Sequence, residues 1–170
     1  MRAPNQQSSG QFTSEYVVGV DGSQASVAAA RWAADRAARE GAPLVVVHAY
    51  QVIALPSVAG PVRTPAMRRA ASEQAEKLLS AVISALPAGS VTEQLLVEGP
   101  PDRLLIQRSQ GAAMLVLGAR PQHSHPHMRF LGSTALRCLR GAECPVVMVP
   151  CPSEVRDAPR QAASAAPAVP

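Results

Sequence analysis

The run YVVGVDGSQASVAAARWAADRAAREGAPLVVVHAY, from Tyr16 to Tyr50, decides the fold because its hydrophobic period changes twice. Apolar residues are nearly continuous from Tyr16 to Val20, as in a buried strand. Ser23 is suited to cap a helix, alanine then recurs at helical spacing, and Gly41 ends the pattern. A second buried strand follows from Leu44 to Ala49. This order of strand, helix and strand predicts a βαβ unit with parallel strands.

The same alternation continues to residue 150. Strands are predicted at 91–97, 113–117 and 145–149, and helices at 66–86, after Pro101, and at 133–140. We therefore expect an α/β fold, a doubly wound, five-stranded parallel sheet with helices on both faces. Residues 51–65 contain three prolines and are predicted to form a loop.

The length of 170 residues favours one domain, which we place at 15–151. Residues 1–14 are polar and residues 152–170 are dominated by Ala and Pro, so we expect two disordered tails. The first fifteen residues lack an apolar core of the kind found in signal peptides, and no apolar run is long enough to span a membrane. These features predict a cytoplasmic protein.

The formal charge of +4 is carried by scattered arginines, and Lys77 is the only lysine. No contiguous basic stripe or helix-turn-helix pattern occurs, so we expect no nucleic-acid partner. Cys138, Cys144 and Cys151 lack the spacing of a zinc site and are expected to be buried or inert thiols.

Two turns are candidates for a ligand site, because ligands of open parallel sheets bind beyond the carboxyl ends of the strands. The first is Asp21–Gly22–Ser23, and the second runs from Gly118 to the helix start at Gly132, Ser133 and Thr134. Gly132 and Ser133 can seat an anion at the helix N-terminus, or Ser133 is only an N-cap. Asp21 can accept from a ribose hydroxyl or hold a metal on phosphate, or only caps its helix.

Several familiar chemistries lack their motifs in this chain. There is no P-loop, no G-x-G-x-x-G after the first strand and no G-x-S-x-G nucleophile elbow. His123, His125 and His127 alternate, but no Cys or Asp stands beside them, so we expect a polar loop and assign no metal ligand.

Several blocks of sequence together resemble the universal stress protein family. They are VVGVDGS from Val17, HAY from His48, EGPPDRLL from Glu98, VLGAR from Val116, and LGSTALRCLRGAECPVVMVP from Leu131 to Pro150. The resemblance implies a Rossmann-like sheet in the order 3-2-1-4-5, a role in stress response, homodimerisation, and binding of ATP or AMP, with Mg²⁺ as a further expectation. It also implies which positions bind the nucleotide: Gly19, Asp21, Ala49, Gly118, Arg120, Gly132, Ser133 and Thr134.

The chain departs from the family's G-x-x-G-x9-G-[ST] signature. Pro121 stands at the second glycine, ten residues separate it from Gly132, and Ala135 replaces a hydroxyl residue common in ATP-binding relatives. Proline lacks a backbone N–H, and losing one hydrogen bond to a charged phosphate costs about 1.5 to 3 kcal/mol.

The sequence is therefore compatible with three alternative functions. The first is a stress-related adenine nucleotide binding regulator without catalytic residues, in which ATP hydrolysis is at most slow. The second is a nucleotide-free homodimeric interaction module that pairs through the edge strand 145–149 and regulates a partner protein. An enzyme acting on an adenylated substrate is least favoured, because the first turn carries no His or Lys.

Side-chain charge can compensate for the lost backbone donor at Pro121. Arg120, Arg129 and the three histidines supply cations near the predicted phosphate, and histidine gains its charge as the pH falls through about 6.5. We therefore expect the affinity for ATP, measured by titration calorimetry, to increase from pH 8 to pH 6. An affinity that stays flat over this interval contradicts the histidine contribution.

Overall fold

The computed structural model describes residues 15–56, 58, 60–119 and 132–151. Both expected tails, the histidine loop and Arg120 lie outside these residues. The described part contains nine helices and strands in strict alternation. In chain order they are β1 (Tyr16–Gly19), α1 (Gln24–Glu40), β2 (Leu44–Tyr50), α2 (Pro65–Ser84), β3 (Glu93–Glu98), α3 (Pro101–Arg108), β4 (Met114–Ala119), α4 (Ser133–Gly141) and β5 (Val146–Pro150).

The sheet has the predicted topology. Its order is β3-β2-β1-β4-β5 and every neighbouring pair is parallel. The chain order reverses at β1, which pairs with β2 on one side and with β4 on the other. All four residues of β1 are buried, as expected for a central strand covered on both faces.

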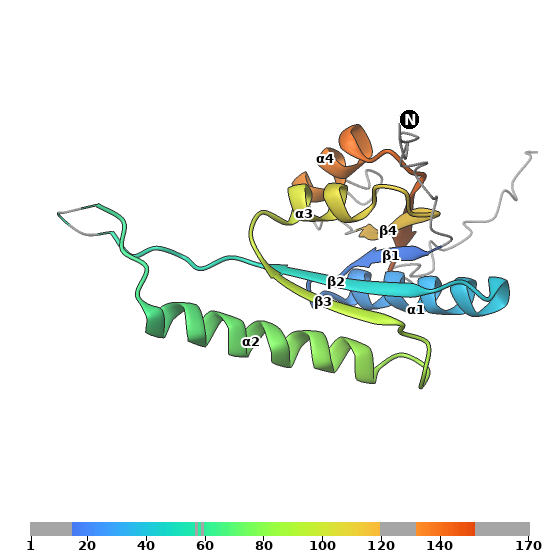
Figure 1. Cartoon of the computed structure of the whole chain (residues 1–170), viewed down its shortest axis with the longest axis horizontal. Helices are drawn as coiled ribbons and strands as arrows, with labels where there is room; N and C mark the ends of the chain where they lie inside the picture. Colours follow the sequence, from blue (N-terminus) through green and yellow to red (C-terminus); the bar gives the residue numbers. More distant parts are fainter. Residues whose placement is uncertain (1–14, 57, 59, 120–131, 152–170) are drawn as a thin grey trace, which may run out of the picture.

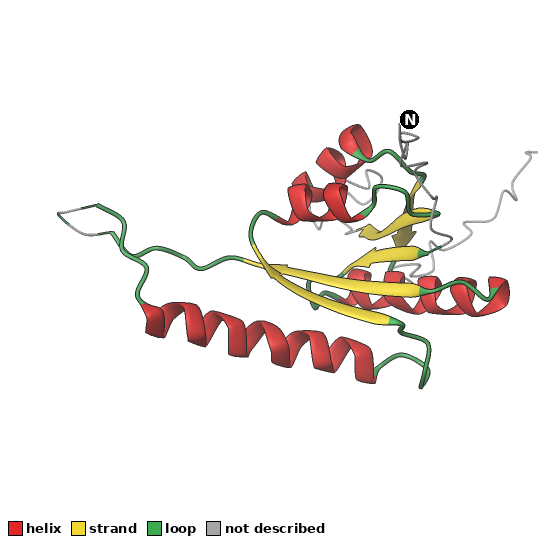
Figure 2. Ribbon diagram, in the orientation of Figure 1, coloured by secondary structure: helices red, strands yellow, loops and turns green. Residues whose placement is uncertain are grey.

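Two helices cover each face of this sheet, as Figures 1 and 2 show. Side chains of β2 alternate between the two resulting cores. Leu44 and Val46 pack with α1 and α2, whereas Val45 and Val47 pack with residues of α3 and α4.

Helix α1 lies close to the sheet because its inner face is made of alanine. Ala29, Ala30, Ala33, Ala34 and Ala37 are all almost fully buried. Ser23 caps the helix as predicted, with Ser26 N donating to Ser23 Oγ at 3.2 Å, and Gly41 ends it with a φ of 63°. None of the helices in the described ranges is long and apolar enough to cross a membrane.

One prediction about the strands needs correction. Gly118 was expected in the turn after the fourth strand, but β4 continues through it, and Gly118 pairs with Val149 of β5. The described residues between β2 and α2 form a loop, as predicted, in which Leu55 and Val62 exchange two backbone hydrogen bonds of 3.0 and 2.9 Å. In Figure 1 this segment reaches well beyond the end of the sheet before it enters α2.

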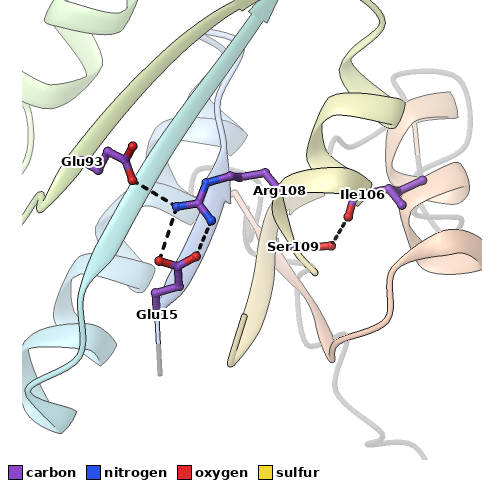
Figure 3. A network of polar contacts seen from close by, with 5 residues as sticks. All are labelled: Glu15, Glu93, Ile106, Arg108 and Ser109. Atoms are coloured by element: carbon purple, nitrogen blue, oxygen red, sulfur yellow. Dashed lines mark hydrogen bonds and ion pairs between the residues drawn. The ribbon is translucent and has the colours of Figure 1, made fainter. Parts of the chain in front are cut away.

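Arg108 ties α3 to the amino ends of two strands (Figure 3). Its guanidinium pairs with Glu15, just before β1, and lies 3.0 Å from Glu93 Oε2 at the start of β3. The Glu15 side chain is only 13% exposed and that of Arg108 30%, so this network is partly shielded from water. It fastens the end of α3 on the side of the sheet opposite to the strands' carboxyl ends.

We expect Arg108→Met to lower the free energy of unfolding by about 1 to 2 kcal/mol, between the values for exposed and buried pairs. The reason is that Glu15 keeps its charge but loses its partner. Urea denaturation measures the effect, and Arg69→Met is the control, because the Arg69–Glu73 pair is 83% and 54% exposed. Equal losses in the two variants would contradict a structural contribution from the Glu15–Arg108–Glu93 network.

Candidate functional site

The carboxyl ends of β1, β2 and β4 surround a cavity of about 230 Å³, which we call the site cavity. The first turns of α3 and α4 and the turn between β1 and α1 complete its wall. The cavity therefore lies where the chain order of the sheet reverses, as expected for a doubly wound fold.

The structure brings together the predicted site residues that it describes. Arg120 lies outside the described residues. The others all line the site cavity: Gly19, Asp21, Ala49, Gly118, Gly132, Ser133 and Thr134. They come from three separate strand ends and one helix start, so their convergence is a result of the fold and not of sequence proximity.

The turn after β1 is held by a small set of hydrogen bonds. Asp21 Oδ1 accepts from Ser23 N at 3.0 Å, and Ser26 Oγ accepts from Asp21 N at 3.2 Å and donates to Ser23 O at 2.9 Å. Asp21 thus stabilises the turn, while Ser23 is the N-cap of α1. Asp21 also lines the site cavity.

His48 of β2 forms a hydrogen bond with Val20, at the start of this turn. The ring is only 7% exposed, and its Nδ1 lies 2.8 Å from Val20 O. Because a carbonyl can only accept, Nδ1 carries the hydrogen, which assigns the tautomer. Sequence reasoning quoted His48 only within a motif and missed this contact, although a lone histidine in a buried strand beside a candidate site was a usable signal.

Gly118 is required by packing, not by a turn. A Cβ at this position would lie 2.5 Å from the backbone C and O of Ala25 and 2.7 Å from Ser26 N. Atoms of a helix backbone cannot rotate away as a side chain can. The absent side chain therefore allows the first turn of α1 to approach β4 at the edge of the cavity.

Gly132 is in the opposite situation, since a Cβ there would meet no atom of the described residues within 4 Å. Gly132 itself is the N-cap of α4, so the interpretation of Ser133 as the N-cap is wrong. No side-chain capping bond forms at this end of α4 in the described residues. Residues of this first turn line the site cavity, and the N–H groups of a helix N-terminus carry a partial positive charge.

The end of β2 contributes backbone groups to the cavity. Val20 N donates to Val47 O at 2.9 Å, and the pairing of β1 with β2 ends at Gly19 and Val47. Because peptide groups of a strand alternate in direction, those of Ala49 point to the same side as those of Val47. The N–H and the C=O of Ala49 therefore lie past the end of β1, next to the cavity that Ala49 lines. They form a hydrogen-bond donor beside an acceptor.

The inner wall of the cavity is apolar, which sequence analysis did not predict. Val47, Leu105 and Leu117 form it, together with the small Ala135. Strand alternation places Val47 and Leu117 on the face that α3 and α4 cover, so their position was accessible from the pattern. That Leu105 reaches the same point depends on how α3 packs.

No group of three or more His, Cys, Asp or Glu side chains in the described ranges is arranged to hold a metal ion. The three histidines of the loop lie outside those ranges. Apart from backbone groups, the residues that line the site cavity are apolar residues, one aspartate, and serine and threonine.

Comparison with known proteins identifies the family. The model of the universal stress protein family matches residues 16–150. A universal stress protein of Mycolicibacterium smegmatis is 33% identical over 82% of this chain, and one of Mycobacterium tuberculosis is 36% identical over 81%. The alignment covers 49% of each, so the chain spans about half the length of these curated relatives.

Solved structures agree with this assignment over the whole domain. A universal stress family protein of Burkholderia pseudomallei is similar with a TM-score of 0.60 and 27% identity, over 86% of this chain and 99% of that one. At 24% identity, a universal stress protein in complex with cAMP and one of Archaeoglobus fulgidus in complex with dAMP share the fold, with TM-scores of 0.52 and 0.51. The cAMP complex covers 82% of this chain and 98% of its own, and the dAMP complex 81% and 98%.

We expect Gly118→Ala to lower the free energy of unfolding by about 2 to 3 kcal/mol, because overpacking here forces α1 away from β4. Gly19→Ala is the matched control, since the atoms nearest to its Cβ would be the side-chain ends of Leu105 and Leu117, at 2.9 Å. Those side chains can change rotamer, so its loss should be about 1 kcal/mol. Chemical denaturation of both variants checks the order, and an equal or smaller loss for Gly118→Ala would contradict it.

Proposed function

This chain belongs to the universal stress protein family, and from that premise we propose that it is a stress-related regulatory protein that binds an adenine nucleotide, ATP or AMP, in the site cavity. The observation that carries the proposal is the convergence of the predicted site residues on one cavity at the reversal point of the sheet. Members of the same fold have been solved with cAMP and dAMP, so the fold accommodates adenine nucleotides.

The nucleobase fits against the end of β2. Val47, Leu105 and Leu117 offer an apolar surface for a flat ring. Beside them, the peptide N–H and C=O of Ala49 form a donor next to an acceptor. An adenine edge carries an acceptor next to an amine donor, which is the complementary pattern.

The phosphate fits at the start of α4. The first-turn N–H groups at Gly132, Ser133 and Thr134 have no side-chain cap in the described residues, and the helix dipole favours an anion there. Gly132 has no side chain that would stand between a phosphate and these donors. Helix ends of this kind bind phosphate without a dedicated lysine.

The ribose lies between these two groups, next to the turn after β1. Asp21 supplies a carboxylate that can accept from a ribose hydroxyl. Mg²⁺ commonly binds through one carboxylate together with phosphate oxygens, so Asp21 is also the residue that would contact a metal ion carried by the nucleotide. In either case its hydrogen bond with Ser23 N keeps it in place.

We assign binding and not catalysis to this site. Near the cavity, Cys138 of α4 is fully buried, and its burial, with the charge of Asp102 adding to it, raises the pKa of the thiol to about 11. The thiol therefore stays protonated at neutral pH and does not act as a nucleophile. Any ATP hydrolysis is expected to be slow and incidental.

The second candidate function is a nucleotide-free, homodimeric interaction module. It is favoured by β5, which is an edge strand whose Val146, Val147 and Met148 are only partly buried. An apolar edge strand can add a strand from another chain. A protein that sediments as a dimer but gives no heat with adenine nucleotides would support this function over the first.

The phosphate position can be tested at Gly132 with two variants of equal size. Its φ of −58° suits any residue, and Asp and Asn are both preferred N-caps, so Gly132→Asp and Gly132→Asn should fold with wild-type stability. The carboxylate of Gly132→Asp repels phosphate, so its Kd for AMP should be at least about tenfold above that of Gly132→Asn.

Titration calorimetry measures both constants, and Ala70→Leu on the exposed part of α2 controls for unrelated surface changes. Equal affinities for AMP in the Asp and Asn variants would contradict the proposal that the phosphate binds at the start of α4. Wild-type protein that gives no heat with millimolar AMP or ATP would end the nucleotide proposal.

A further inference from the structure

A second cavity of about 350 Å³ adjoins the site cavity, and we call it the side cavity. The two share a wall made of Ala49, Pro101, Ser133 and Thr134. Three polar residues line the side cavity but not the site cavity: Gln51, Asp102 and Arg137. They come from the segment after β2, the first turn of α3 and the second turn of α4, so packing alone brings them together.

Asp102 and Arg137 form an ion pair across this cavity wall. Arg137 Nη1 lies 3.0 Å from Asp102 Oδ2, and the Asp102 side chain is 13% exposed whereas that of Arg137 is 67% exposed. The guanidinium holds the pKa of Asp102 below its usual range, so the carboxylate remains ionised. One N–H of Arg137 is used in this contact, and its guanidinium carries further donors.

The chemistry of this wall suits a neutral polar group better than a phosphate. The charges of Asp102 and Arg137 cancel, and a fixed carboxylate beside the cavity repels an anion. At the same time the wall offers donors on Arg137 and Gln51 and acceptors on Asp102 and Gln51. The edge of a nucleobase presents donors and acceptors side by side and has no net charge.

The position of the side cavity points to the same ligand group. Its wall includes Ala49, whose peptide groups face the base in the proposed binding mode, and Gln51, the first residue after β2. A base that lies against Ala49 thus directs its outer substituents into the side cavity. Ser133 and Thr134 line both cavities, but Gly132 lines the site cavity alone, and only the side cavity has the carboxylate of Asp102 in its wall. The phosphate is therefore assigned to the site cavity.

We propose that the side cavity is a specificity subsite for the outer edge of the nucleobase, in which Gln51, Asp102 and Arg137 determine which base is bound. The inference rests on the proposed nucleotide function and deepens it. The wild-type protein then prefers AMP to GMP, and the preference depends on the Asp102–Arg137 pair.

Two variants test the subsite, Arg137→Met and Asp102→Asn. The Arg137 side chain is 67% exposed, so its replacement costs little stability. Asp102 is only 13% exposed, but asparagine has the same size and keeps a side-chain acceptor. Arg140→Met is the matched control, because Arg140 lies on the same helix, is exposed and lines neither cavity. Full-length protein is titrated with AMP, GMP and adenosine, and thermal melts confirm folding.

Loss of one charge-assisted hydrogen bond to the base should narrow the AMP to GMP preference by about tenfold in Arg137→Met and in Asp102→Asn. Because the contact is with the base, adenosine and AMP should lose affinity in the same proportion. Arg140→Met should match the wild type with all three ligands.

Arg137→Met protein that binds AMP more weakly but adenosine normally would show that the subsite takes phosphate, which overturns the inference. An unchanged AMP to GMP ratio in both variants would overturn it as well, while leaving the proposed nucleotide function intact. If the wild-type protein binds neither AMP nor adenosine, the proposed nucleotide function is wrong, and the subsite inference that rests on it is wrong as well.

Discussion

The contact between β4 and the first turn of α1 is the constraint on which the rest of the structure depends. It exists because Gly118 has no side chain, which leaves the backbone of Ala25 room to lie against the strand. The alanine face of α1 continues the same close approach along the sheet. Because α1 lies this close to the strands, the Asp21–Ser23 turn that precedes it lines the same cavity as the ends of β2 and β4. The site cavity is the space that this arrangement leaves open, so its geometry follows from small residues in the core.

Much of the fold could be predicted from the sequence, because its signals are local. Runs of valine and leucine marked the strands, and Ser23 and Gly41 marked the ends of α1, so the elements were found in their observed order. The strand order 3-2-1-4-5 came from the family resemblance, and the structure confirms it. The end of β4 was placed too early because glycine usually interrupts strands, whereas Gly118 continues one for a packing reason that only tertiary contacts reveal.

The candidate site was predictable in its glycines and polar turn residues but not in its walls. Asp21, Gly118 and Gly132 stand out in the sequence because turns and helix starts favour such residues. Leu105 looks like any core residue, and only the packing of α3 brings it to the cavity, whereas strand alternation already places Leu117 on that face of the sheet. Gln51, Asp102 and Arg137 lie far apart in the sequence on three different segments. No periodicity relates them, so the side cavity follows only from three-dimensional structure.

The two candidate functions share one helix. Helix α4 begins at the site cavity and ends at Gly141, and Ala142 N then donates to Cys138 O at 2.8 Å, which fixes the exit of the chain from the helix. Pro145 O accepts from Leu115 N at 2.9 Å, so β5 starts in register with β4 only a few residues later. A ligand held by the first turn of α4 would therefore contact a helix whose buried Ala135 and Cys138 share a core cluster with Val146 and Met148 of the edge strand. Because the cavity and the edge strand use different parts of this unit, the proposed nucleotide site and the proposed pairing surface do not overlap.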